Sequence, residues 1–220
     1  MDKRIIIIGN TSNANLVHYF FTRDSAYTVE AFSVEREYIQ SSEFCGLEVV
    51  PLEDLESRFP PEEYDAFVAV GYTQMNKVRE KLYDQVKAMG YHLPNYISSK
   101  CSFLTDEKIG DNNLILEDNT IQPFVKIGSN NVLWSGNHIG HDVQIEDHCY
   151  ITSHVVISGF TKIRHHSFLG VNSTFRDDIE IAPFTLIGAG VTVNSNTSEG
   201  DILLPPKPFK MEKKSWDIKI

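Results

Sequence analysis

The sequence lacks any apolar run long enough to cross a bilayer, which requires about 20 consecutive apolar residues. The apolar stretch near its start, Ile5 to Ile8, is too short for the apolar region of a signal peptide and leads directly into Gly9. We therefore expect no membrane partner, no secretory leader and a cytoplasmic location.

Cysteine is scarce, and positive charge is in deficit. Cys45, Cys101 and Cys149 are odd in number and lack metal-ligand spacing, so they predict buried, reduced thiols. The chain has 20 Lys and Arg against 30 Asp and Glu, a net charge of −10. Because nucleic-acid binding depends on Lys and Arg contacts to phosphates, this composition argues against nucleic acid as the main partner.

The sequence does contain a six-residue repeat without insertion over residues 109–197. Every sixth residue is large and apolar, and the residue four positions later is small, β-branched or Asn and never charged. Neither the helical period nor the alternation of a half-buried strand explains this pattern, whereas a hexapeptide parallel β-helix does. The apolar series is Ile109, Ile115, Ile121, Ile127, Leu133, Ile139, Ile145, Ile151, Ile157, Ile163, Leu169, Phe175, Ile181, Ile187 and Val193.

Three sixes form one triangular coil, so this series predicts about five coils in an all-β domain over residues 101–198. The large residue should fill the interior, and the small residue should lie beside a tight corner. Asn113, Asn119, Asn131 and Asn137 suit such corners because Asn tolerates left-handed backbone angles. An ordinary antiparallel β domain would show turn signals at irregular intervals, which the unbroken phase disfavours.

Residues 1–100 predict a small α/β domain, because apolar strand patterns alternate with helical patterns. This alternation indicates a parallel, Rossmann-like sheet. The expected strands are residues 4–8, 27–34, 48–50, 64–70 and 92–97, and the expected helices are residues 14–21, 52–59 and 76–89.

Two turns follow the carboxyl ends of predicted strands, where open parallel sheets bind ligands and helix N-termini hold phosphates. The first turn lacks the G-x-G-x-x-G pattern, so a dinucleotide signal is absent. Two interpretations stay open: both turns are plain connections, or backbone N–H groups and polar side chains hold a nucleotide or a nucleotide-sugar diphosphate. The candidate residues are Gly9, Asn10, Thr11, Ser12 and Asn13, followed by Gly71 and Tyr72.

Six of the eight histidines lie between residues 138 and 166, and His is suited to proton transfer near neutral pH. His148 and His166 are eighteen residues apart, so they should stack on consecutive coils in a structural role. In the pair His141-Asp142, the carboxylate can fix the tautomer of the imidazole, provided that the chain bends there. β-helices that hold a metal through three histidines have two of them five positions apart, and this sequence has no such pair, so we expect no metal.

These stretches resemble the bacterial acyl-coenzyme-A-dependent sugar acyltransferases, which join an N-terminal nucleotide-sugar domain to a C-terminal left-handed β-helix. That group includes the N-acetyltransferase that makes diacetylated bacillosamine, related dTDP- and GDP-4-amino-sugar N-acetyltransferases, and the sialic acid O-acetyltransferase. The resemblance covers nearly the whole chain. It is carried by residues 7–9, 68–72, 137–145, 156–159 and 168–172, with Asn76 and Arg79.

We expect a homotrimer, because a lone β-helix this short would expose flat strand faces that assembly covers. The resemblance implies an N-acetyltransferase of glycan or lipopolysaccharide O-antigen biosynthesis. Its donor would be acetyl-CoA, and its acceptor a nucleotide-linked amino sugar, such as a 4-amino-6-deoxyhexose. The alternatives are O-acetylation of the sialic acid type and a nucleotide-sugar-binding scaffold without turnover. The implied residues are His141 as general base with Asp142; Asn137 and His138 at the sugar; Tyr150, Gly159, Val171, Asn172 and Ala189 at acetyl-CoA; and the two turns with Asn76 at the nucleotide sugar.

The chain departs from the family pattern in several places. Asn10 to Ala14 replace the usual x-Ser-Gly-His-Gly after the first glycine, and Ser33-Val34-Glu35 replaces an acidic pair, so the nucleotide base is not identified. Tyr150 stands where many members carry His near the cofactor sulfur.

Residues 199–220 form a tail, in which Pro205, Pro206 and Pro208 end the β-helix and replace the family's closing Gly-x-Pro-Ala. From Lys207 onward the tail has five Lys against two acidic residues. It is either a solvated tail or a basic edge for the phosphates of a carrier such as CoA.

Overall fold

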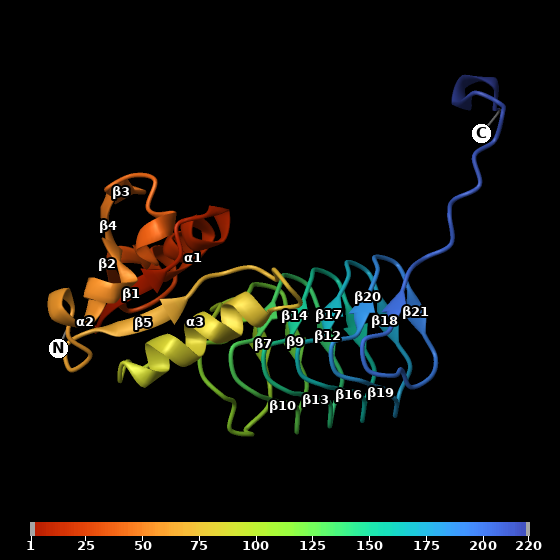
Figure 1. The fold of residues 1–220 in the computed structure, drawn as a ribbon. Coiled ribbons are helices and arrows are strands. Elements are labelled where there is room, and N and C mark those ends of the chain that lie inside the picture. Colours follow the sequence, from red (N-terminus) through yellow and green to blue (C-terminus); the bar gives the residue numbers. More distant parts are fainter. Residues whose placement is uncertain (1–2, 219–220) are drawn as a thin grey trace.

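The computed structural model describes residues 3–218, so Met1, Asp2, Lys219 and Ile220 lie outside the described range. An α/β part sits against one end of a long three-sided β-helix, and the chain ends in a tail that extends away from the far end of the helix (Figure 1). Within residues 3–218, no helix combines the length and the apolar character that a membrane crossing demands.

The N-terminal sheet has the strand order β3-β4-β2-β1-β5 and is parallel except for the β3–β4 hairpin. Alternate residues of β1 enter different cores: Ile5 and Ile7 pack with α1, and Ile6 and Ile8 pack with α3. The predicted parallel sheet is confirmed, and cores on both of its faces cover it. The strands are β1 (Lys3–Ile8), β2 (Tyr27–Val34), β3 (Glu43–Phe44), β4 (Leu47–Pro51) and β5 (Asp65–Val68), and the helices are α1 (Ser12–Arg23), α2 (Leu55–Arg58) and α3 (Lys77–Ala88), with 3₁₀ turns at Arg36–Tyr38, Leu52–Asp54 and Ser215–Asp217.

The β-helix has three parallel sheets, which we name faces A, B and C. Face A contains β6 (Tyr96–Ile97), β8 (Leu114–Ile115), β11 (Val132–Leu133), β14 (Tyr150–Ile151), β17 (Phe168–Leu169), β20 (Leu186–Ile187) and β22 (Ile202–Leu203). Face B contains β7 (Ser102–Phe103), β9 (Thr120–Ile121), β12 (His138–Ile139), β15 (Val156–Ile157), β18 (Thr174–Phe175) and β21 (Thr192–Val193). Face C contains β10 (Lys126–Ile127), β13 (Gln144–Ile145), β16 (Lys162–Ile163) and β19 (Glu180–Ile181).

The predicted apolar series forms the interior of the coil. Its members from Ile115 to Val193 are at most 3% exposed, and Ile109 is partly buried against them. The β-helix is longer than residues 101–198, because β6 and β22 pair with it at its two ends. The strand expected at residues 92–97 of the α/β sheet is therefore wrong, since Tyr96 and Ile97 pair with Leu114 and Ile115.

The prediction of left-handed Asn at the corners needs correction. The residues with positive φ lie one position earlier, at every sixth residue from Asn112 to Gly190. Asn113, Asn119, Asn131 and Asn137 point inward instead, and their amides bond backbone groups of their own and neighbouring coils. The free energy of these buried hydrogen bonds, rather than backbone tolerance, explains why Asn stands at these positions.

Face A alone bears outward apolar residues at its N-terminal end, because it packs on the α/β part. Leu114, Val132 and Tyr150 join Phe21 and Phe67 in one core. The outward residues of face C are instead charged or polar. The two parts therefore share a continuous apolar junction.

Candidate functional site

His141 and Asp142 lie at the corner that follows β12 and joins face B to face C, which we name the B/C corner. Asp142 has φ of 59°, so the chain bends and both side chains reach the same side. His141 Nδ1 lies 3.0 Å from Asp142 Oδ2; the His141 side chain is exposed and the Asp142 side chain is half-buried. With Nδ1–H donating to the carboxylate, Nε2 is the basic nitrogen available to a substrate. The bend that the pair requires is present.

Gly159, on the next coil, leaves the space that the His141 imidazole occupies. A Cβ at this position would lie 2.8 Å from His141 Cε1 and 2.9 Å from Nε2, so any larger residue would displace the ring. The backbone N–H of His141 donates to Gln122 Oε1 at 2.9 Å. Among residues 3–218, the N–H of Gly159 has no hydrogen-bond acceptor, which leaves a donor beside the imidazole.

The α/β part contributes a cleft of about 750 Å³ at the carboxyl ends of β1, β2 and β5. The N-terminus of α1 opens into this cleft and has no acidic residue in its first turn, so its partial positive charge is available to an anion. At Gly71, a Cβ would lie 2.8 Å from Asn13 Nδ2, so glycine allows the two turns to approach. Of the predicted residues, the cleft is lined by Gly9, Asn10, Thr11, Asn13, Gly71 and Tyr72.

Ser12 is not among the cleft-lining residues, and Asn76 is wholly buried. Asn76 has φ of 68° and accepts a hydrogen bond from Arg79, so we withdraw it from the substrate contacts. Sequence analysis missed Tyr38 and Lys81, which line the same cleft. Lys81 pairs with Glu35 at 2.6 Å, and only the fold brings these residues together.

A second groove, of about 430 Å³, follows the corner between faces A and B, which we name the A/B corner. It is lined by Tyr72 and Tyr150, whose rings meet edge to face at 5.0 Å, and by Val171 and Ala189. Its remaining lining residues are Trp134, Thr152, Ser153, Phe168 and Gly170, so the whole groove is uncharged. Asn172 is exposed at the same corner but outside the groove, and Gly159 lies at the other end of face B.

Arg79 lies at the junction of the α/β part and the β-helix and contacts both. It is 1% exposed, and its guanidinium donates to the carbonyls of Gly71, Asn130, His148 and Cys149. Burial lowers the pKa of Arg79 to about 10, so it remains charged at neutral pH. Its guanidinium carbon lies 5.5 Å from the Tyr150 ring centre. Arg79 thereby fixes the Gly71 turn against the β-helix, a role that no sequence motif announced.

Asn137 does not line a pocket. It is 1% exposed, and its amide bonds Trp134 O and the Val155 N–H inside the coil. Its expected contact with the sugar is therefore wrong for this chain. His138 is exposed on β12 of face B, three residues before His141 at the corner that follows this strand.

His148 and His166 stack with ring centres 5.0 Å apart, as their spacing predicted. They lie beside α3, and His166 Nε2 is 3.1 Å from Glu80 Oε2. Within residues 3–218, no three His, Cys, Asp or Glu side chains form a group that could hold a metal ion.

The three cysteines are free thiols, but only Cys149 is fully buried, whereas Cys45 is exposed. Burial raises the pKa of Cys149 to about 12, so its thiol stays protonated and unreactive at neutral pH. Cys149 therefore packs the coil and is unsuited to act as a nucleophile.

Residues 125–159 match the family model described as bacterial transferase hexapeptide (six repeats). This part of the β-helix therefore carries hexapeptide repeats of the bacterial transferase type. This match spans the His141 corner and confirms the repeat that the period of six predicted.

The fold of nearly the whole chain is similar to that of several solved structures, among them acetyltransferases. The acetyltransferase domain of PglB from Neisseria gonorrhoeae superposes with a TM-score of 0.81 at 20% identity, covering 94% of this chain and 100% of that one. PerB from Caulobacter crescentus, in complex with CoA and GDP-perosamine, gives 0.81 at 21% identity, covering 93% and 95%. WeeI from Acinetobacter baumannii gives 0.77 at 20% identity, covering 92% and 97%. These likenesses establish the fold of both parts of the chain.

Proposed function

We propose that this chain is an acetyl-CoA-dependent N-acetyltransferase that acts on a nucleotide-linked amino sugar, of the 4-amino-6-deoxyhexose class. The observation that carries the proposal is the exposed His141–Asp142 pair, seated over Gly159 on a transferase hexapeptide repeat. Similar folds belong to an enzyme solved with CoA and GDP-perosamine and to a domain solved with acetyl coenzyme A.

In this proposal the amine of the sugar attacks the thioester carbon of acetyl-CoA directly. His141 Nε2 accepts the proton that the amine loses, and Asp142 stabilises the imidazolium and holds its tautomer. A C–N bond forms, the C–S bond breaks, and His141 returns the proton to the departing CoA sulfur. The free N–H of Gly159 is placed beside the imidazole, where it can donate to the developing oxyanion.

The A/B groove suits the pantetheine arm of acetyl-CoA, because that arm is long, uncharged and amide-bearing. Tyr150, Val171 and Ala189 would contact it, and Asn172 would lie at its edge. Within the described residues, the N–H groups of Val171 and Ala189 have no acceptor, so they can bond the pantetheine carbonyls.

The cleft of the α/β part suits the nucleotide diphosphate of the acceptor. We interpret this part as a Rossmann-like domain in which the α1 N-terminus and the turn at Asn10, Thr11 and Asn13 hold the phosphates. Tyr72 lines both this cleft and the A/B groove, which brings the two ligands to neighbouring sites.

His141 and the A/B groove lie at opposite edges of face B, so one chain does not complete the site. We propose a homotrimer in which the B/C corner of each subunit meets the A/B corner of the next. Face B is suited to such contact, because Ser102, Thr120, His138, Val156, Thr174 and Thr192 project from it without an acidic or permanently basic side chain.

The direct test is incubation with acetyl-CoA and a panel of UDP-, dTDP- and GDP-linked amino sugars, with detection of the free thiol of CoA. Thiol release together with an acetamide product supports the proposal. An ester product would instead support O-acetylation of the sialic acid type. Binding without thiol release would leave a nucleotide-sugar-binding scaffold. The cytoplasmic location stays a prediction.

A further inference from the structure

Three corner positions of the β-helix hold a residue type that rarely adopts a positive φ. Fourteen residues from 112 to 190 have positive φ, and all are Asn, Asp, His or Gly apart from Phe124, Phe160 and Phe184. Asn, Asp, His and Gly adopt this conformation readily, whereas a bulky aromatic residue there is an outlier. Strain of this kind persists where the side chain has a use that compensates for it.

Two of these three phenylalanines flank the His141–Asp142 pair. Phe124, Asp142 and Phe160 occupy equivalent corner positions on three consecutive coils. The ring centre of Phe160 lies 5.0 Å from that of His141, edge to face. Phe124 is 62% exposed and Phe160 is 52% exposed, so neither contributes much to the interior of the protein.

Between the two rings runs a groove of about 450 Å³. Its polar lining consists of Lys126, Gln144 and Lys162 on face C and the acidic residues Glu107, Asp142 and Asp178. This mixture of donors and acceptors without an excess of positive charge is unsuited to a polyanion such as the nucleotide of CoA. It is suited to a neutral ligand with many hydroxyl groups.

We propose that Phe124 and Phe160 form an aromatic platform for the pyranose ring of the acceptor, and that the groove residues bond its hydroxyl groups. The apolar C–H face of a sugar ring is complementary to the negative face of an aromatic ring. The platform deepens the proposed function, on which it rests, because it places the sugar next to His141. It also replaces the sugar contact that Asn137 cannot make.

Phe160→Asn is the decisive variant, and Phe184→Asn is its matched control. Asn adopts the left-handed corner conformation readily, so both variants should fold with melting temperatures close to that of wild type. Phe184 has the same backbone conformation, but it stacks on His166 at the corner between faces C and A. Calorimetric titration measures Kd for acetyl-CoA, for UDP, dTDP and GDP, and for the same nucleotides linked to a 4-amino-4,6-dideoxyhexose.

Phe160→Asn should weaken binding of the cognate nucleotide sugar about tenfold, as expected for the loss of one aromatic contact. Its Kd for the free nucleotide and for acetyl-CoA, its melting temperature and its mass in solution should stay those of wild type. Phe184→Asn should leave both the nucleotide-sugar and the free-nucleotide Kd unchanged.

An unchanged nucleotide-sugar Kd in Phe160→Asn overturns the platform while leaving the proposed function intact. An equal loss of affinity for the free nucleotide also overturns it, because the effect would then not be specific to the sugar ring. If wild type binds neither acetyl-CoA nor any nucleotide sugar, the proposed function fails, and the platform fails with it.

Discussion

At the scale of single residues, the left-handed corner position accounts for three of the six clustered histidines. His148, His154 and His166 all have positive φ, which His tolerates better than most side chains. His141 stands one residue earlier, where the side chain projects from the corner, and it alone of the six His pairs with a carboxylate on the adjacent residue. His165 has the same position in the six-residue unit, but its Nδ1 lies 3.0 Å from His166 Nδ1 and not beside a carboxylate. The adjacent Asp142 therefore distinguishes the proposed base from the other histidines.

His141→Asn should lower kcat by about 10²–10⁴, because it removes the proposed general base without changing the shape of the corner. Steady-state kinetics at saturating substrates measures this effect, and calorimetry should show unchanged acetyl-CoA binding. His154→Asn, at another corner of the β-helix, is the control and should retain wild-type kcat. A His141→Asn enzyme with more than about half the wild-type kcat would move the search for the base to His138, His154 or His165.

At the scale of elements, the stacked His148 and His166 link the β-helix to α3. Burial lowers the pKa of both imidazoles, and the neighbouring His166 further lowers the pKa of His148. Glu80 and Asp147 favour protonation of this cluster, whereas Arg79 and His165 oppose it. The net effect lowers the pKa of both imidazoles. In the folded state the pair therefore stays neutral at pH values where the unfolded chain begins to bind protons.

The free energy of unfolding should therefore fall as the pH drops below about 6.5, the ordinary pKa of His. Above that pH both states are neutral and the pair makes no pH-dependent contribution. Urea denaturation at about pH 7.5 and about pH 5.5 measures the difference. In the double variant His148→Asn/His166→Asn this part of the pH dependence should vanish, and a slope equal to that of wild type would show that other groups cause it.

At the scale of the whole molecule, the separation of His141 from the A/B groove makes assembly a condition of activity. Light scattering at micromolar concentration should therefore give about three times the chain mass of 25.0 kDa. Thr174→Arg, on β18 of face B, should dissociate the trimer and abolish turnover, because three like charges would meet there. Thr22→Arg, an exposed position on α1 outside every groove described above, is the control and should leave assembly and turnover unchanged. A stable, active monomer would refute the shared site.

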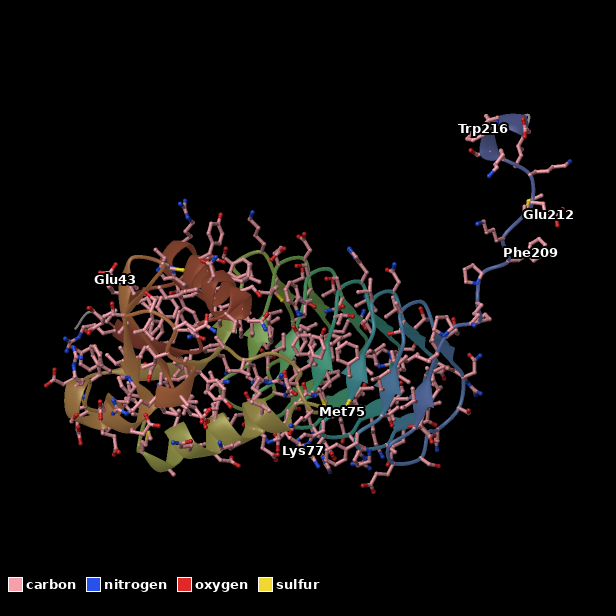
Figure 2. All side chains as sticks on the ribbon, turned by 45° about the horizontal axis from the view of Figure 1, so that its top comes forward. Glu43, Met75, Lys77, Phe209, Glu212 and Trp216 are labelled. Atoms are coloured by element: carbon pink, nitrogen blue, oxygen red, sulfur yellow. The ribbon has the colours of Figure 1, made fainter. Side chains whose placement is uncertain are left out.

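The tail is the second feature at this scale. It leaves the last coil beside Gly188, close to the A/B groove, and Phe209, Glu212 and Trp216 stand clear of the β-helix (Figure 2). Phe209 is 91% exposed and Trp216 is 80% exposed. Lys219, one of the five tail lysines, lies outside the described residues.

A chain that ends at Pro206 should keep its melting temperature, since the tail packs on no core residue in the described structure. If the lysines bind the phosphates of CoA, its Kd for acetyl-CoA should rise about tenfold at low salt and by less at 0.5 M salt. Dephospho-CoA should lose less affinity than CoA on the same truncation. An unchanged Kd would mean that the tail is solvated in the complex.

The sequence alone determined the β-helix, because a period of six can bury its apolar residues in no other regular structure. It also indicated the parallel α/β sheet and the His141–Asp142 pair, whose chemistry depends on adjacent residues. It misplaced the left-handed positions by one residue, since inward Asn side chains and left-handed Asn cannot be distinguished by composition.

The tertiary structure decided everything that depends on contacts between distant residues. Asn76 and Asn137 proved to be buried, because their amides bond backbone groups that the sequence does not bring together. Arg79 donates to carbonyls on two consecutive coils, at Asn130 and at His148 and Cys149, up to 70 residues away. Phe124 and Phe160 flank the His141–Asp142 pair because the 18-residue coil stacks residues 124, 142 and 160 in one column, and the sequence alone did not single them out.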